Sequence, residues 1–213
     1  MFPVPVDFFP QKKLLIASHN PGKVNEFAIL VKHWDVQLVS AASLNLPEPE
    51  ETGVTFTENA RLKARAAAQK GLAALADDSG LCVETLDGAP GIHSARWAGP
   101  DKNFAAAMRR VEKMLLEKTK NTSGHRAEFV AALALYFPDG TLIESQGRVT
   151  GALSFPPRGD KGFGYDPIFV PQDSSLTFAE MEPAQKQAND HRARAFRVLE
   201  KRLRSCGVAK VRR

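Results

Sequence analysis

The sequence predicts an α/β fold built on a mixed β-sheet. Strand-like and helix-like segments alternate along its 213 residues, and they are joined both by helical crossovers and by a hairpin turn at residues 138–140. A chain of this length can bury a real core, as one large domain or as two small lobes. Residues 127–170 are strand-rich, so we expect a second lobe there, and a cleft between lobes is a common ligand site.

The N-terminal part of the chain contains two predicted strands and two predicted helices. Residues 14–17 are apolar, and residues 36–41 alternate between polar and apolar side chains, as strands do. Pro21 suits the first turn of a helix between these strands. Thr55 and Glu58 have capping-box spacing, and the alanine-rich run after them favours a second helix.

The remaining elements follow the same logic. Residues 72–80 predict a buried strand that ends in acidic residues, and residues 82–88 predict its neighbour. Residues 102–118 predict a third helix. The strand-rich part continues through residues 162–170, and a final helix covers about residues 184–204.

The composition is that of a globular protein, with 43% apolar and 25% charged residues. Two cysteines, Cys82 and Cys206, are too few for a disulfide framework or a four-ligand zinc site, so we expect a reducing, cytoplasmic environment. Residues 1–12 are interrupted by prolines and make a poor signal peptide. The longest apolar run, residues 129–137, is about half the length that a membrane span requires.

The charge balance is basic, with a formal charge of +5 and a pI near 9.3. One interpretation is binding to nucleic acid through its phosphates. The basic residues are scattered, however, and few aromatic residues alternate with them, so we expect no nucleic-acid partner and no membrane partner. We expect an N-terminal extension at residues 1–12, one domain at 13–204 and a basic tail at 205–213.

Residues 18–23, Ser-His-Asn-Pro-Gly-Lys, lie between a predicted strand and a predicted helix. They are not the standard phosphate loop, because Ala17 and Val24 occupy its glycine and Ser/Thr positions. The helix start still exposes backbone N–H groups, and Lys23 adds a positive charge. On spacing alone, an anion site and a simple capped turn are equally compatible with this segment.

Two acidic pairs provide candidate metal ligands. Asp77 and Asp78 are expected at a strand end, where adjacent side chains point to opposite faces, so that one of them faces a given site. A carboxylate in that place suits Mg²⁺, which prefers oxygen ligands. Glu50 and Glu51 precede a predicted turn at Thr52-Gly53 and are candidates for a second carboxylate ligand. The alternative is that these acidic residues are ordinary turn residues with no metal-binding role, which is the more common case.

Residues 162–169, Gly-Phe-Gly-Tyr-Asp-Pro-Ile-Phe, form a candidate base-binding segment. Two glycines flank Phe163, which leaves room for a ligand close to the backbone and beside an aromatic face. Asp166 can accept a hydrogen bond from a ring N–H. The alternative is a strand edge whose aromatic side chains pack into the core.

The last predicted helix carries a further pair of polar residues. His191 shares a face with apolar residues, where a lone histidine is more often a core residue than a ligand-binding one. Arg192 offers a rigid fork of hydrogen-bond donors. Either the helix is continuous, or Asn189 and Asp190 cap it and place His191 and Arg192 in its first turn.

In this order the motifs resemble the inosine triphosphate pyrophosphatase family, and the similarity spans about residues 13–204. The resemblance implies an elongated α/β fold with a central mixed sheet, two lobes and an active-site cleft between them, usually in a homodimer. It also implies Mg²⁺-dependent hydrolysis of ITP, dITP and XTP to the nucleoside monophosphate and pyrophosphate. The segments that carry it are residues 18–23, 50–64, 76–81, 88–99, 162–169, and Lys186 with His191 and Arg192.

The resemblance assigns roles to individual residues. Asp78 would be the catalytic residue that orients and deprotonates the water attacking the α-phosphorus. Glu50, Glu51 and Asp78 would be the metal ligands, with the choice between the two glutamates open. The substrate-binding residues would be Ser18, His19, Asn20, Pro21, Gly22, Lys23, Lys63, Ser79, Phe163, Gly164, Tyr165, Asp166, Lys186, His191 and Arg192.

One position departs from the family pattern. The family usually has serine or threonine before the His-Arg pair, whereas this chain has Asp190. The carboxylate could pair with Arg192 or alter the contacts with the base, so it bears on fine specificity rather than on the reaction.

Three other functions fit parts of the sequence. One is a pyrophosphatase for modified pyrimidine nucleotides, but the His191-Arg192 pair argues against it. Another is a catalytically silent nucleotide sensor, which would be expected to have lost the acidic residues that this chain keeps. A nucleic-acid-binding module rests on the basic pI alone.

Overall fold

The computed structural model describes residues 9–211 of the chain. These residues fall into two compact units. Unit 1 comprises Met1–Asp78, Ala132–Gly147 and Arg192–Arg213, and unit 2 comprises Ser79–Ala131 and Arg148–His191. Unit 2 therefore differs from the expected second lobe, because it begins at Ser79 and leaves the hairpin around residues 138–140 to unit 1.

Six strands of the described chain form one mixed sheet in the order β2-β1-β3-β4-β5-β6. Strand β1 pairs in parallel with both β2 and β3, whereas β5 and β6 are antiparallel, and this confirms the predicted α/β fold with a mixed sheet. The strands are β1 (Lys13–Ile16), β2 (Gln37–Ser40), β3 (Ala73–Val83), β4 (Arg126–Tyr136), β5 (Leu142–Leu153) and β6 (Phe169–Pro171).

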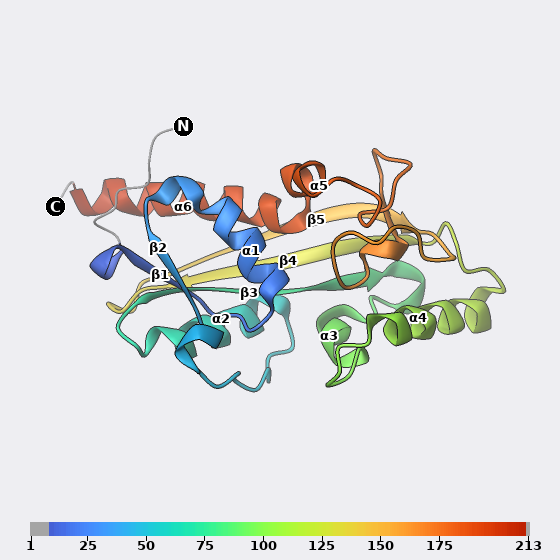
Figure 1. Ribbon diagram of the computed structural model, residues 1–213, viewed down its shortest axis with the longest axis horizontal. Helices are drawn as coiled ribbons and strands as arrows, with labels where there is room; N and C mark the ends of the chain where they lie inside the picture. Colours follow the sequence, from blue (N-terminus) through green and yellow to red (C-terminus); the bar gives the residue numbers. More distant parts are fainter. Residues whose placement is uncertain (1–8, 212–213) are drawn as a thin grey trace. The chain divides into compact units, whose positions relative to one another are not determined.

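Unit 1 has helices on both faces of its part of the sheet. Helices α1 (Pro21–Leu30) and α6 (His191–Val211) lie on one face of β1 and β3, and α2 (Phe56–Ala68) lies on the other (Figure 1). The side chain of Asn20 caps α1. Thr55 and Glu58 form the predicted capping box of α2, so the sequence signals for both helix starts are confirmed.

Strand β3 is one continuous element, which corrects the prediction of a strand at residues 72–80 that ends in acidic residues and a separate neighbour at residues 82–88. Its eleven residues run from Ala73 to Val83 and are almost all buried, with Asp77 and Asp78 in the middle. Acidic pairs are rare inside strands because burial of a charge is costly. Here both carboxylates have cationic partners, so the strand can pass through them without a turn.

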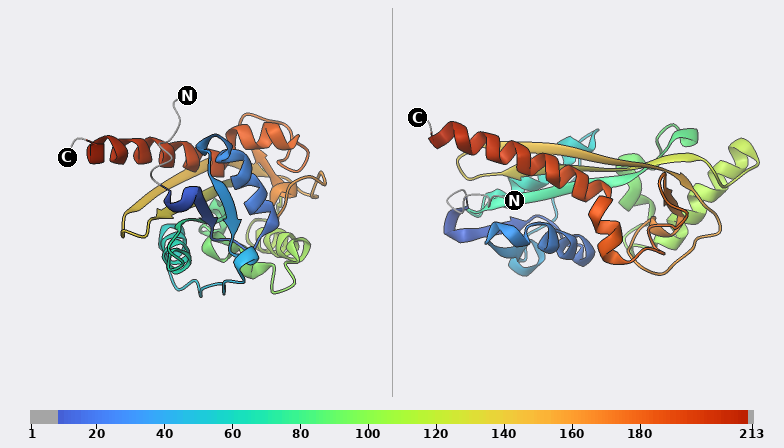
Figure 2. Two further views of the ribbon diagram at one scale, coloured as in Figure 1. Left: turned by 60° about the vertical axis from the view of Figure 1, so that its left-hand side comes forward. Right: turned by 90° about the horizontal axis from the view of Figure 1, so that it is seen from above.

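Unit 2 packs around an aromatic and aliphatic core. Helix α4 (Phe104–Thr119), the green helix of Figure 2, matches the predicted third helix and packs on this core through Met108, Val111 and Leu115. The turn-rich segment before it contains the short helix α3 (Ser94–Trp97).

The segment at residues 162–170 is mostly a loop, whereas a strand was expected. Only Phe169–Pro171 forms a strand, and Asp166–Ile168 forms a single 3₁₀ turn. Gly162 and Gly164 have φ values of +75° and +71°, which belong to the left-handed region and interrupt an extended chain. The glycines therefore produce the loop.

The final helical region is divided in two. Helix α5 (Pro183–Asn189) ends at Asp190, whose backbone is extended (φ −69°, ψ 171°), and α6 begins at the next residue. The alternative with a break at Asp190 is thus correct, and His191 and Arg192 lie in the first turn of α6.

The two ends of the described chain are more ordered than the sequence indicates. Phe9 is buried and its ring stacks on Trp34, which in turn stacks on Phe196 of α6. The expected extension therefore contributes to the core of unit 1 from Phe9 onward, and its first eight residues lie outside the described part. Helix α6 continues to Val211, so most of the expected basic tail is helical. No helix in residues 9–211 has the length and apolar character of a membrane span.

Candidate active site

The loop from Ser18 to Lys23 connects β1 to α1 and is already organised. The side-chain oxygen of Asn20 accepts hydrogen bonds from the backbone N–H groups of Gly22 (2.9 Å) and Lys23 (3.3 Å). Ser18 Oγ in turn accepts one from the Asn20 N–H at 3.1 Å. The N–H donors that the sequence predicted for an anion are present, and in this state Asn20 binds two of them.

Lys23 lies in a charged cluster on the α1 and α6 face of β3. Its Nζ is 3.2 Å from Asp77 Oδ2, and the same oxygen accepts hydrogen bonds from Nε (3.3 Å) and Nη2 (3.1 Å) of Arg192. Arg192 also donates to Glu26 of α1. Arg192 and Asp77 are 1% and 2% exposed, so the ion-pair network through which α6 and α1 meet β3 has a buried centre, with Lys23 and Glu26 half-buried at its edge.

The pKa of Asp77 is held well below its ordinary range. Burial raises it, but the charges of Lys23, Arg192 and Lys63 together outweigh burial. The pKa of Lys23 is lowered, because the burial of its ammonium outweighs the attraction of Asp77. Asp77 is therefore a permanent carboxylate in this cluster.

Asp78 points to the opposite face and belongs to a second cluster with α2. Lys63 Nζ lies 3.1 Å from Asp78 Oδ1 and 2.8 Å from Glu51 Oε1, and so bridges the two carboxylates. Asn59 Nδ2 donates to Asp78 Oδ2 at 3.2 Å. The predicted alternation of the acidic pair between two faces is confirmed, with a different set of partners on each face.

Asn59 was not among the predicted site residues. It is fully buried on α2, and its side-chain oxygen accepts a hydrogen bond from Gly53 N at 2.8 Å, which ties the segment after Glu51 to the helix. A side chain added at Gly53 would collide with Asn59. An asparagine on the same helical face as Ala60 and Lys63 was the signal that could have revealed it.

The pKa values of the Asp78 cluster shift in the opposite sense to that of Asp77. Burial raises the pKa of Asp78, Lys63 lowers it and Glu51 raises it again, with a net increase. For Lys63, burial lowers the pKa, but the attraction of Asp78, Asp77 and Glu51 outweighs burial and the pKa is raised. Lys63 thus stays charged, while Asp78 is the more easily protonated of the two aspartates.

The donor chemistry of this cluster fits a divalent cation. A cationic ammonium already lies between Glu51 and Asp78, and carboxylate oxygens are the ligands that Mg²⁺ prefers. Glu50 is exposed and makes no ion pair among the described residues, whereas Glu51 contacts Lys63 beside Asp78. The described chain has no group of three His, Cys, Asp or Glu side chains arranged around a metal position.

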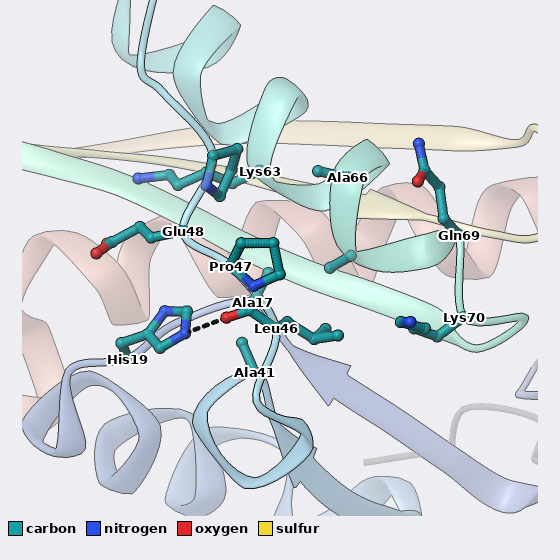
Figure 3. Close-up of a pocket in the computed structure, with 12 residues that line it drawn as sticks. Ala17, His19, Ala41, Leu46, Pro47, Glu48, Lys63, Ala66, Gln69 and Lys70 are labelled. Carbon is teal, nitrogen blue, oxygen red and sulfur yellow. Dashed lines mark hydrogen bonds between the residues drawn. The ribbon is translucent and has the colours of Figure 1, made fainter.

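A cavity of about 330 Å³ opens beside the Lys63 cluster (Figure 3). His19 and Lys63 line it, and the ring Nε2 of His19 lies 2.7 Å from the Leu46 carbonyl oxygen in its wall. Its other walls are mostly alanine, leucine and proline side chains. Two of the residues predicted to bind the triphosphate are thus brought to one cavity in unit 1.

In unit 2, the loop at Phe163 is held by Asp166. One carboxylate oxygen, Oδ2, accepts hydrogen bonds from Phe163 N at 2.9 Å and from Lys186 Nζ at 2.7 Å. A side chain at Gly162 would collide with this carboxylate. The glycine therefore makes room for Asp166, where the sequence suggested room for a ligand. Lys186 Nζ lies 4.9 Å from the centre of the Phe163 ring, a cation–π contact.

Three other predicted residues lie in unit 2. Tyr165 is 2% exposed and donates its hydroxyl hydrogen bond to the Ser94 carbonyl oxygen at 3.0 Å, so its side chain is part of the core of unit 2. The ring of His191 stacks on Phe129 with centroids 4.8 Å apart. Ser79 is half-buried in β3.

Comparison with known proteins places the chain in a family. A profile of the Ham1 family matches residues 14–202, nearly the whole chain. This chain belongs to the Ham1 family.

Several Ham1 relatives are similar over almost their full length. The dITP/XTP pyrophosphatase of Rhodospirillum centenum is 58% identical over 192 residues, which are 90% of this chain and 94% of the relative. The dITP/XTP pyrophosphatase of Caulobacter vibrioides is 57% identical, with 90% and 97% of the two chains covered. The solved HAM1 protein of Coxiella burnetii is 36% identical, with a TM-score of 0.81 and 91% and 98% coverage. The resemblance expected from the ordered motifs is confirmed.

Proposed function

We propose that this protein hydrolyses the non-canonical purine nucleoside triphosphates ITP, dITP and XTP to the nucleoside monophosphate and pyrophosphate. The observation that carries the proposal is Asp78, a buried carboxylate with a raised pKa, held between Lys63 and Asn59 and facing Glu51 through the Lys63 ammonium. The names of relatives at 57–58% identity support the substrate class.

Glu51 and Asp78 would hold Mg²⁺. When bound, the ion neutralises charge on the phosphate oxygens. The ammonium of Lys63 already lies on both carboxylates, so it is in place to contact any phosphate oxygen that approaches them. Lys23, at the start of α1, is the second cation of unit 1 that we assign to the triphosphate.

Asp78 is the proton acceptor in this proposal. Its oxygens accept hydrogen bonds from Lys63 and Asn59, which fix the orientation of the carboxylate. A raised pKa brings the group closer to the working pH and makes it a better acceptor for the proton of the attacking water. The water would attack the α-phosphorus, and pyrophosphate would leave with its charge balanced by Lys63 and Lys23.

Base recognition is assigned to Phe163, Lys186, His191 and Arg192. Hypoxanthine and xanthine carry an oxygen at position 6, where adenine carries an amino group, so hydrogen-bond donors favour the former. A mismatched buried polar group costs on the order of 1–3 kcal/mol. Two such mismatches would give a discrimination of about 10²-fold or more against ATP.

The remaining parts of the proposal concern the cellular compartment, the oligomeric state and the partners of the enzyme. We propose a cytoplasmic homodimer that acts on free nucleotides and has no nucleic-acid partner. The two free cysteines, of which Cys206 is exposed, agree with a reducing compartment.

The test is pyrophosphate release from ITP, dITP, XTP, GTP and ATP by the purified protein, with and without Mg²⁺. Rapid, Mg²⁺-dependent release from ITP, dITP and XTP, with slow turnover of GTP and ATP, is expected. Absence of turnover of every nucleotide would overturn the proposal. Equal turnover of all five would leave the phosphate chemistry intact and overturn the assignment of base recognition.

A further inference from the structure

Tyr165 lies in the candidate base-binding loop, yet its side chain faces the core. Its ring packs edge-on against Phe104 of α4, with centroids 5.5 Å apart and an interplanar angle of 82°. Its hydroxyl donates to the Ser94 carbonyl oxygen at 3.0 Å. Burial raises the pKa of Tyr165 well above its ordinary value, so the hydroxyl remains a donor throughout the neutral range.

Ser94, the acceptor, is also fixed to strand β3. Its Oγ accepts a hydrogen bond from Leu81 N at 3.0 Å and donates one to the Gly91 carbonyl oxygen at 2.7 Å. Gly80 has no space for a side chain, because a Cβ there would collide with Gly91 and Ser94. The turn at residues 91–94 is therefore pressed directly against the strand segment that follows Ser79.

These contacts form a continuous connection within unit 2. It runs from β3 at Leu81, through Ser94, to Tyr165 in the loop. The residues on either side of Tyr165 in the loop are those that the proposed function assigns to the base. They are linked to one another, because Asp166 Oδ2 accepts hydrogen bonds from Phe163 N and Lys186 Nζ. A shift of Tyr165 would therefore move Phe163 and the Asp166–Lys186 pair together relative to β3.

We propose that Tyr165 is a positioning residue, whose hydroxyl bond to Ser94 fixes the base-binding loop against the Ser79–Val83 segment of β3 and thereby sets affinity and selectivity for the purine. The inference rests on the proposed function. It replaces the direct contact between Tyr165 and substrate that the family resemblance implied. The hydroxyl acts through Phe163, Asp166 and Lys186 and touches neither base nor phosphate.

The deciding variant is Tyr165→Phe, which removes one oxygen and keeps the ring against Phe104. Tyr136→Phe is the matched control, since Tyr136 is the other tyrosine of the chain and its hydroxyl makes no hydrogen bond among the described residues. Two measurements are made on the full chain: steady-state kinetics with ITP and GTP, and hydrogen exchange of the backbone amides at residues 162–166.

In Tyr165→Phe we expect the loop amides to exchange faster. We expect the KM for ITP to be about three- to tenfold higher and the preference for ITP over GTP to be smaller, whereas kcat should stay within about twofold of that of the original protein. Tyr136→Phe should match the original protein in all of these. A loss confined to kcat would overturn the inference, because positioning of the base affects binding, whereas a direct catalytic role would affect turnover.

The two proposals fail in different ways. Unchanged loop exchange in Tyr165→Phe overturns the positioning role whether or not the protein hydrolyses ITP. Faster exchange with unaltered KM and selectivity overturns the link from loop position to recognition. If the original protein turns over no nucleotide, the proposed function fails, and the positioning of a purine site fails with it.

Ser94→Ala provides an independent check on the same connection. It keeps the carbonyl that accepts from Tyr165 but removes the Oγ that binds Leu81 and Gly91. The same rise in KM and the same increase in loop exchange are expected. A lower melting temperature without either change would mean that Ser94 is only structural and would contradict the proposed connection.

Discussion

Asp77 and Asp78 are neighbours in one strand and are both buried, yet their environments drive their pKa values in opposite directions. On the α1 and α6 face, Asp77 has two close cations, Lys23 and Arg192, and its pKa falls. On the α2 face, Asp78 shares a single ammonium with a second carboxylate, Glu51, and its pKa rises. The number of cations per carboxylate, and not the depth of burial, decides which aspartate can take up a proton.

We assign catalysis to Asp78, whereas Asp77 pairs with Lys23 and Arg192 and so should contribute mainly to stability. The largest effect should follow from Asp78→Asn, which removes the proton acceptor and a metal ligand. We expect kcat for ITP to fall by about 10²–10⁴-fold, with little change in the unfolding midpoint. Pyrophosphate release and urea denaturation measure the two quantities. Full activity in this variant would remove Asp78 from the mechanism.

The reciprocal change, Asp77→Asn, should act mainly on folding. It leaves Arg192 and Lys23 buried with less counter-charge, and breaking a buried ion pair in this way costs about 3–5 kcal/mol of unfolding free energy. Urea denaturation provides the measurement. Asp35→Asn is a suitable control, because Asp35 is exposed and its positive φ is one that asparagine tolerates, so a change below about 0.5 kcal/mol is expected.

The difference in unfolding free energy between the original protein and Asp77→Asn should depend on pH, because the pKa of Asp77 is lowered. A carboxylate with a depressed native pKa contributes stability that is fully present above its ordinary value of 3.8 and is lost as the pH falls through the native pKa. The stability gap between the original protein and Asp77→Asn should therefore be constant at neutral pH and shrink only below about pH 4. A gap that disappears between pH 7 and 5 would contradict the assignment.

A smaller effect should distinguish the two adjacent glutamates. Glu51 contacts Lys63 beside Asp78, whereas Glu50 is exposed. Glu51→Gln should raise the Mg²⁺ concentration for half-maximal activity by about tenfold or more, and Glu50→Gln should leave it unchanged. Mg²⁺ titrations of pyrophosphate release measure both. The reverse order of effects would mean that Glu50 approaches the metal in the working enzyme.

The smallest effect concerns the reactivity of the two cysteines, one of which, Cys82, lies in β3 like the two aspartates. Cys82 lies beyond Asp78 in the same strand, and burial raises the pKa of its thiol to about 11. Since only the thiolate reacts readily, iodoacetamide at pH 8 should label the exposed Cys206 and leave Cys82 unmodified until the chain is unfolded. Mass spectrometry of the labelled peptides checks this, and rapid labelling of the half-buried Cys82 in the native protein would contradict its raised pKa.

The parts of the structure that the sequence predicted well have local causes. The caps of α1 and α2 depend on Asn20, Thr55 and Glu58, each of which acts within a few residues of its own position. The alternation of Asp77 and Asp78 follows from strand geometry alone.

The parts that sequence reasoning missed depend on contacts between distant residues. Asp77 and Asp78 read as a strand end because their partners, Arg192 and Lys63, are far away in the chain. Asn59 lies on the buried face of α2, which the sequence pattern could have revealed, but its partners Asp78 and Gly53 are known only from the structure. No local pattern reveals that the hydroxyl of Tyr165 meets Ser94, which lies 71 residues away in the chain.

The two tryptophans of the chain fall one in each unit, which gives the molecule two built-in optical reporters. Trp34 is fully buried between Phe9 and Phe196, whereas Trp97 is half-buried beneath the guanidinium of Arg110. With either indole replaced by phenylalanine, the emission of the other would follow the unfolding of its own unit alone. Fluorescence would then reveal whether the two units melt as one cooperative body or in sequence.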